Sequence, residues 1–405
     1  MFKSLSLKVI IFGFIFTFFS CFGQSFFIGL FNSSIRETLS ITHGQFGTIY
    51  ASATLFSSLL LIWIGKKIDD VNVIKFAIFV TILLSFSSFF FSKTSSVAFL
   101  FVAIFLMRFS GQGLMSHTAS TTISRYFTKS RGKALSIIWF GLSSAEFIMP
   151  VLIVYLLTIV IWQDLWVIFS IIVLICLPLA SYFLVKDVKL DTRENTQNEK
   201  LKENNIKNWK RIEVLGDYRF YIVSLNMLAM PWIATGVFVY QSFVTNSKGW
   251  GEYTIAQSFM SYSIFSVITL IVAGYLIDKF TSRKLLIYMN IPLFLGTLVI
   301  IYFDAPQTAF LFLGLVGISN GLANLLGSST WAEIYGVKYI GSIKALTTAL
   351  MDPRYLTPYS SAQVDDPKIL AKPLDIPTKP KNTKAVTGVS KKNRTITDNK
   401  SGIFI

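Results

Sequence analysis

Apolar side chains fill ten long stretches of the chain, and short polar segments separate them. A helix of about 20 apolar residues matches the thickness of the hydrocarbon core of a bilayer. Because backbone groups in lipid must be hydrogen-bonded within their own segment, each stretch is predicted to be a spanning helix. The predicted spans are 9–30, 47–64, 74–92, 97–120, 135–157, 166–185, 220–243, 255–275, 285–303 and 309–328.

Composition supports the same fold class. The chain has 405 residues, of which 53% are hydrophobic and 14% charged, whereas a soluble domain carries about 25% charge. An all-α integral membrane protein surrounded by lipid is therefore expected. The basic start and apolar run of residues 1–23 resemble a signal peptide, but the length of the run and the spans that follow favour a retained first span.

The net charge of +16 comes from basic residues in connections and in the last 54 residues. This distribution argues against nucleic-acid binding. The second, fourth, sixth and eighth connections are rich in Lys and Arg, and the odd connections carry little charge. By the positive-inside rule, the even connections and the N-terminus are predicted to be cytoplasmic.

Loop motifs recur 209 residues apart. Gly65 and Asp69 in GKKIDDVNVIK correspond to Gly274 and Asp278 in GYLIDKFTSRK, and Tyr126 corresponds to Tyr335. A polar Lys/Glu/Asn-rich stretch separates the two copies. The predicted organisation is a six-span bundle (1–185), a cytoplasmic linker (186–219), an incomplete second bundle (220–351) and a polar, disordered tail (352–405).

These motifs resemble those of the major facilitator superfamily. GYLIDKFTSRK matches the signature G-x-x-x-D-[RK]-x-x-x-[RK]-[RK], GKKIDDVNVIK is a degraded copy of it, and RFSGQG at 108–113 resembles the fourth-span signature. FGQSFFIGLFNSSIRETLS and SHTASTT are similar to bacterial monocarboxylate and oxalate–formate carriers. The resemblance implies two pseudo-repeated bundles, the bacterial inner membrane, and secondary transport of a small organic anion with a proton or counter-anion as coupling partner.

The resemblance also implies that the signature residues hold the two halves together when the cytoplasmic side is closed. Asp278 is expected to lie near the start of the fifth span, at Arg131–Leu135, and Asp69 near Gly341–Ala345. Carboxylates can accept hydrogen bonds from free helix N-termini there. Alternatively, these charges only mark the bilayer boundary. The candidate latch residues are Gly65, Asp69, Arg131, Gly274, Asp278, Arg283 and Lys284.

Two opposite charges lie near mid-bilayer, Arg108 in the fourth span and Glu146 in the fifth. Charged groups at this depth are costly, so both are expected to face each other or a shared cavity. Three interpretations remain open: a structural ion pair, recognition of an anion by Arg108, and proton coupling through Glu146.

Other polar groups near mid-membrane are candidate substrate contacts or interhelical hydrogen bonds: Gln24, Gln112, Tyr240, Gln241, Asn320, Asn324 and His117. Gly111, Gly113, Gly314, Gly317 and Gly321 are expected to allow close helix approach, and Pro150 and Pro231 to bend their helices. Cys21 and Cys176 are predicted to be small core residues. No metal-ligand spacing, phosphate loop or nucleophile–base cluster occurs, so neither an enzyme nor a cofactor is expected.

The apolar pattern breaks after residue 351. Residues 352–405 hold six of the 11 prolines and no apolar run long enough to span. Two of the expected twelve spans are thus missing, which favours a truncated or frame-shifted reading over a regulatory tail. The alternative to a transporter is a non-transporting membrane protein, such as a sensor, an assembly partner or an inactive remnant.

Overall fold

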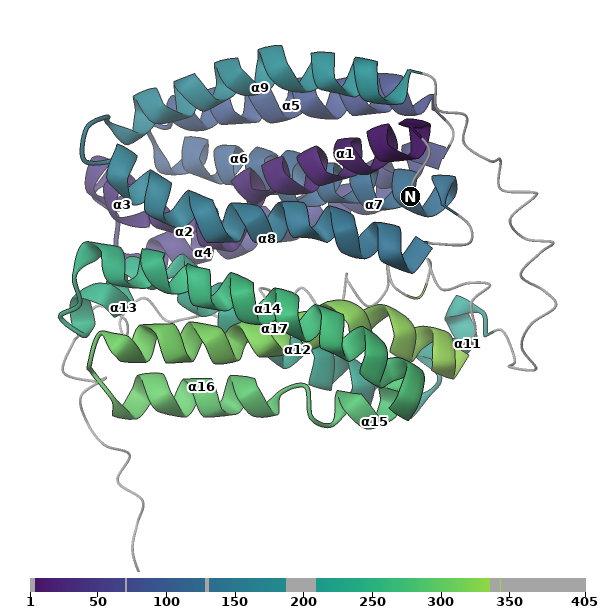
Figure 1. The fold of residues 1–405 in the computed structure, drawn as a ribbon. Coiled ribbons are helices and arrows are strands. Elements are labelled where there is room, and N and C mark those ends of the chain that lie inside the picture. The colour runs from purple at the N-terminus through teal and green to yellow at the C-terminus, as the bar shows by residue number, and fades with distance from the viewer. Residues whose placement is uncertain (1–3, 70, 128–130, 187–208, 336–342, 344–405) are drawn as a thin grey trace, which may run out of the picture. The chain divides into compact units, whose positions relative to one another are not determined.

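The structure is a computed structural model, and it describes residues 4–69, 71–127, 131–186, 209–335 and 343. Residues 1–365 form one compact unit, and the second unit, 366–405, lies outside the described residues. The predicted tail at 352–405 therefore also lies outside them. All secondary structure within the described ranges is helical (Figure 1).

The part of the chain before the linker contains most of the helices. They are α1 (Ser4–Phe19), the 3-10 helix η1 (Ser20–Gly23), α2 (Ser25–Leu30), α3 (Asn32–Leu39), α4 (His43–Ile64), η2 (Gly65–Asp69), α5 (Val73–Ser92), α6 (Val97–Met107), the π-helix η3 (Arg108–Met115), α7 (Ser116–Tyr126), α8 (Arg131–Leu156) and α9 (Trp162–Val185).

After the linker follow α11 (Arg211–Leu215), α12 (Tyr218–Val239), α13 (Gln241–Ser247), α14 (Glu252–Phe280), α15 (Ser282–Leu286), α16 (Ile291–Tyr302) and α17 (Gln307–Tyr335). Polar residues at the helix starts satisfy backbone N–H groups that have no intrahelical partner. Thr42 and Gln45 form a reciprocal capping box at α4. The side chains of Asn72 and Asp217 cap α5 and α12 by accepting from Ile74 N and Arg219 N, without a reciprocal bond.

Length and composition identify seven described helices as able to cross a membrane: Val73–Ser92, Val97–Ile123, Ala134–Leu156, Trp162–Val185, Tyr218–Val239, Tyr253–Ala273 and Ser282–Tyr302. The other three predicted spans coincide with α1 to α2, α4 and α17. Large apolar side chains on the outer faces are exposed, for example Trp63 at 75% and Ile175 at 56%. The protein is therefore a multi-pass membrane protein whose outer faces suit contact with lipid.

The sequence pattern was wrong about continuity in two spans. The first span is broken at η1 and Gln24, and the seventh at Tyr240. It was also wrong about Cys176, which is exposed, whereas Cys21 is buried. Hydropathy cannot separate these cases, because a lipid-facing side chain and a core side chain are both apolar.

Helix packing relies on small and hydroxyl side chains. Within the first half, α5 packs along α9, where Ser85 Oγ donates to Ser170 O at 2.9 Å. In the second half α14 packs along α17, and a Cβ on Gly317 would collide with the backbone of Tyr262. The glycines of this helix thus allow close approach, as expected from the sequence.

Trp209, in the last part of the predicted linker, contacts the end of α17. Trp209 N donates to Tyr335 O at 3.0 Å, and its ring meets the Tyr335 ring edge-on at 5.5 Å. Tyr335 Oη in turn donates to Asp217 Oδ2 at 3.2 Å, and Arg219 pairs with the same carboxylate at 2.9 Å. The hydrogen bond from the Arg219 side chain lowers the pKa of Asp217 below its ordinary value. Residues 209–217 therefore belong structurally to the second half.

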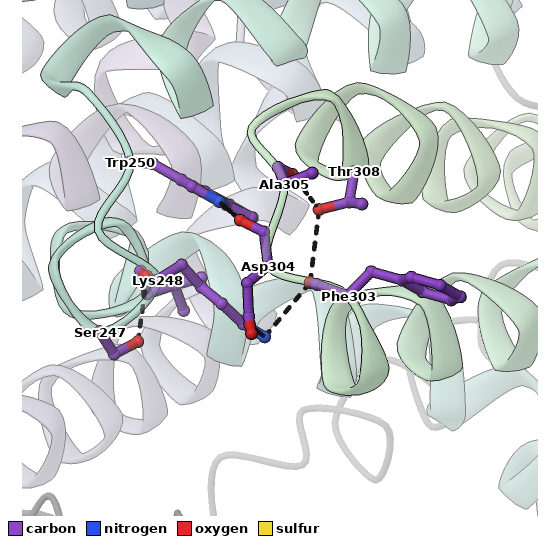
Figure 2. Close-up of polar contacts among 8 residues, drawn as sticks. Ser247, Lys248, Trp250, Phe303, Asp304, Ala305 and Thr308 are labelled. Carbon is purple, nitrogen blue, oxygen red and sulfur yellow. Dashed lines mark hydrogen bonds and ion pairs between the residues drawn. The ribbon is translucent and has the colours of Figure 1, made fainter.

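At the opposite end of the second half, the loop after α13 is tied to the loop before α17. Lys248 Nζ forms an ion pair with Asp304 Oδ1 at 2.5 Å, and Trp250 Nε1 donates to Asp304 O at 2.5 Å (Figure 2). Thr308 Oγ1 donates to Ala305 O within the second loop at 2.5 Å. These bonds join two connections that the sequence marked only as weakly charged.

Candidate functional site

Two irregular helices meet in the interior of the first half. The chain leaves the helical conformation at Gln24, whose φ of −81° and ψ of 151° are extended. This break lies against η3, the π-helical part of the fourth span, and the two segments are in direct contact. A Cβ on Gly23 would collide with the backbone of Gln112, and one on Gly111 with the backbone of Gly23. Both glycines are therefore required for this contact.

Arg108 lies at the start of the π-helix and is 2% exposed. Its Nη1 donates to Gly23 O at 2.7 Å and to Ser25 Oγ at 3.3 Å. Its guanidinium carbon lies 5.4 Å from the centre of the Tyr50 ring, within the range of a cation–π interaction. Tyr50 Oη donates to Ser25 Oγ at 3.0 Å. Side chains from η3, α2 and α4 thus surround the broken first span.

Glu146 lies on α8 and is 6% exposed. Its helix packs against α1 of the first half and against α14 of the second half. It is therefore positioned where the first span and both halves meet. A structural ion pair, recognition of an anion by Arg108 and proton coupling through Glu146 all remain predictions for these two charges.

The remaining predicted polar residues divide into three groups. Four of them make interhelical hydrogen bonds. Tyr240 Oη donates to His43 O at 3.3 Å, and Gln241 Nε2 donates to Phe26 O at 2.9 Å. Asn320 Nδ2 donates to Ser266 Oγ at 2.9 Å, and His117 Nε2 bonds Gly65 O at 2.9 Å. Gln24 and Gln112 are half-buried beside the break, and Asn324 is exposed. Of these last three residues, Gln24 forms the break and Gln112 lies on η3, the helix that carries Arg108.

The two halves pack mainly through α8 and α14, and they are also joined by hydrogen bonds at the break in the seventh span. Asn32 Nδ2 donates to Val239 O at 2.5 Å, and Gln241 Nε2 donates to Phe26 O in the reverse direction. A Cβ on Gly29 would collide with the carbonyl of Phe238. Further along the seam, Ser263 Oγ of α14 donates to Ser143 O of α8 at 2.6 Å.

The expected latch can be followed only in part. Gly274 and Asp278 lie on α14 and Arg131 on α8, but the side chains of Asp69, Asp278 and Arg131 lie outside the described residues, as does the segment Gly341–Ser342. Arg283 is described, and its Nη2 donates to Glu333 O at 2.5 Å, while Glu333 Oε1 accepts from Ser282 N at 2.8 Å. Glu333 thus caps α15. Lys284 is exposed.

Sequence reasoning missed Ser25, Tyr50, Asn32 and Glu333. Ser25 and Tyr50 sit in otherwise apolar spans, where a single hydroxyl group gives no periodic signal. The available indication was Gly23–Gln24–Ser25, a run of small and polar residues inside a span, which can mark a helix break.

The fold defines a class of protein, a multi-pass helical membrane protein. Among the described residues, no group of His, Cys, Asp and Glu side chains could hold a metal ion. The sequence profile described as Major Facilitator Superfamily matches residues 13–352, well over half of the chain. The chain belongs to this family.

Solved structures agree with that assignment of fold. A bacterial homologue of the human lysosomal transporter Spinster, in an inward-facing and occupied conformation, is similar with a TM-score of 0.63 at 15% identity, covering 86% of this chain and 78% of that one. The unoccupied form of the same homologue has a TM-score of 0.62 at 16% identity, and the match covers 88% of this chain and 82% of that one. A mutant of the nucleoside transporter NupG has a TM-score of 0.60 at 14% identity, and the match covers 87% of this chain and 88% of that one. No curated protein sequence matches the chain.

Proposed function

We propose that the protein is a secondary active transporter of a small organic anion, such as a monocarboxylate, and that it works by alternating access. The observation that carries this proposal is the buried guanidinium of Arg108 beside the broken first span. A charged group at membrane depth is costly and is by default a functional-site candidate. The planar donors of arginine match the two oxygens of a carboxylate.

The broken helices support the same proposal. Irregular backbone at membrane depth is tolerated only where it is buried in protein or lines a cavity. Transporters of other folds place their substrate at such breaks, where backbone groups are not used up by the helix. The break at Gln24 adjoins η3, and Gln24 and Gln112 lie beside it. These two amides are our candidate substrate contacts in addition to Arg108, with Tyr240 and Asn320 assigned to helix–helix contacts.

Glu146 is our candidate for the coupling group. A buried carboxyl group on α8, the helix that packs against both α1 and α14, can bind and release a proton as the two halves separate and rejoin. Coupling would then be to a proton, with a counter-anion as the alternative coupling partner. Under the orientation predicted from loop charge, the contacts of Asn32 and Gln241 lie at the outer end of the spans, and the signature residues at the cytoplasmic end.

Counterflow in proteoliposomes tests the proposal. Vesicles loaded with an unlabelled monocarboxylate should accumulate the same labelled compound transiently, and the uncharged amide of that acid should not compete. A nucleoside, the substrate class named for one structural neighbour, serves as the comparison substrate. Counterflow of the nucleoside but not of any carboxylate would overturn the organic-anion proposal. No counterflow of any compound would favour the non-transporting alternative.

A further inference from the structure

Ser25 connects Tyr50 to Arg108 through its hydroxyl group. Its hydroxyl oxygen accepts hydrogen bonds from Tyr50 Oη at 3.0 Å and from Arg108 Nη1 at 3.3 Å. Ser25 is 6% exposed, and Tyr50 and Arg108 are 2% exposed each. The three residues come from α2, α4 and η3, so the cluster joins three separate elements.

The orientation of the guanidinium is the property that this cluster controls. Arginine has a long, flexible side chain, and holding it in one rotamer costs conformational entropy. Here the Tyr50 ring lies 5.4 Å below the guanidinium carbon, and the Gly23 carbonyl accepts from Nη1 at 2.7 Å. The Tyr50 ring fixes the plane of the guanidinium, and the Gly23 carbonyl fixes the edge that carries Nη1. Two parallel hydrogen bonds to a carboxylate require such a fixed plane.

The geometry points to Tyr50 and Ser25 as positioning residues, which hold Arg108 in the orientation that recognises the carboxylate of the transported anion. This inference rests on the proposed transport of an organic anion. Tyr50 acts through its ring on the plane of the guanidinium and through its hydroxyl on Ser25. Neither residue needs to touch the substrate. Carboxylate selectivity is thus a property of three helices together rather than of Arg108 alone.

Two substitutions separate positioning from folding. Tyr50→Phe keeps the ring and removes the hydroxyl group, and Ser25→Ala removes the shared acceptor. Both should raise the KM for the anion roughly tenfold, the order expected for weakening one hydrogen bond to a charged group. The maximal rate should change less than about twofold, since the amount of folded protein stays the same. Competition by the uncharged amide should become relatively stronger, because the preference for a carboxylate is reduced.

Matched controls come from hydroxyl groups of the same kind elsewhere. Ser144 Oγ donates to Phe140 O of its own helix at 2.7 Å, and Tyr182 is exposed on the outer face of α9. Ser144→Ala and Tyr182→Phe should leave KM and selectivity unchanged. Detergent thermal unfolding of each variant measures its stability directly.

The outcomes separate the two proposals. If the unaltered protein shows no carboxylate counterflow, the organic-anion proposal fails and the positioning role falls with it. If the unaltered protein transports the anion but Tyr50→Phe and Ser25→Ala keep its KM and selectivity, only the positioning role is overturned. A loss of maximal rate and of unfolding temperature, with KM unchanged, likewise overturns it in favour of a structural role.

Discussion

Arg108 and Glu146 are predicted to lie at similar depth, but this depth does not tell which groups either side chain contacts. Arg108 bonds the Gly23 carbonyl and Ser25, and Glu146 is buried on α8, which packs against α1 and α14. The two side chains therefore offer separate chemistries, an oriented cation and a buried carboxyl group. Each can be tested by one substitution.

Arg108→Ala and Arg108→Lys are both expected to abolish transport of the anion. Lysine keeps the positive charge, but its ammonium group cannot offer two parallel donors in one plane. Counterflow in proteoliposomes, corrected for the amount of reconstituted protein, measures the effect. Near-normal transport by the lysine variant would show that paired recognition of the carboxylate is wrong.

Glu146→Gln is expected to slow uptake driven by a pH gradient more than it slows exchange of substrate for substrate. The amide has nearly the same shape but cannot bind and release a proton, so only the coupled cycle loses a step. The ratio of the two rates, compared with that of the unaltered protein, is the measurement. An equal loss in both assays would assign Glu146 a structural role.

Element ends in the second half are held by contacts between loops and helix termini. At one end, Trp250 joins the loop after α13 to the loop before α17. At the other end, Asp217 both caps α12 and accepts from Tyr335 at the end of α17. These contacts differ in burial, which predicts different contributions to stability.

Trp250→Phe is expected to lower the free energy of unfolding more than Asp304→Asn does. Trp250 is 6% exposed, so removing its N–H from the Asp304 carbonyl should cost about 1 kcal/mol. The Asp304 side chain is 77% exposed, and its pairing with Lys248 should contribute less than about 0.5 kcal/mol. Thermal unfolding of the two variants in detergent compares them. A larger effect of Asp304→Asn would contradict this order.

The contribution of Asp217 to stability should disappear in acid. Its pKa is lower in the folded protein than the ordinary value of about 3.9, because Arg219 donates to its carboxylate. The stabilisation is therefore present above about pH 4 and is lost as the pH falls through the lower, folded pKa. The difference in unfolding temperature between the unaltered protein and Asp217→Asn should shrink between pH 5 and pH 3. A constant difference would show that the ionised carboxylate does not matter.

At the scale of the whole molecule, two hydrogen bonds from side-chain amides join the two halves, one in each direction. Asn32 of the first half donates to Val239 O, and Gln241 of the second half donates to Phe26 O. Alternating access requires the halves to separate at each end in turn, so these bonds must break when this end opens. Removing them should shift the conformational equilibrium towards the state open at this end.

Labelling of the native Cys21 thiol can measure this shift in the conformational equilibrium. The chain has two cysteines, so Cys176→Ser leaves Cys21 as a single buried thiol beside the broken first span. In this background, Asn32→Ala and Gln241→Ala should each increase the rate of labelling by a membrane-impermeant thiol reagent several-fold. Asn320→Ala is the matched control, because Asn320 bonds Ser266 within the second half. Equal rates in all three variants would show that the amide pair does not restrain opening.

The sequence by itself determined the membrane class, the family resemblance and the approximate place of every span. These follow from apolar length, loop charge and short motifs, all of which are local along the chain, and the family match over 13–352 and the helices confirm the class and the fold. Arg108 and Glu146 were also found locally, because a charge within an apolar run is conspicuous.

Only the tertiary structure decided what those charges contact and where the helices break. The bond from Arg108 to Gly23 spans 85 residues, and that from Gln241 to Phe26 spans 215. The break at Gln24 exists where Gly23 and Gly111 bring two backbones together. Apolar patterns carry no information about such pairs, since a lipid-facing and a buried surface have the same hydropathy. Partners far apart in the chain are fixed only when the helices pack.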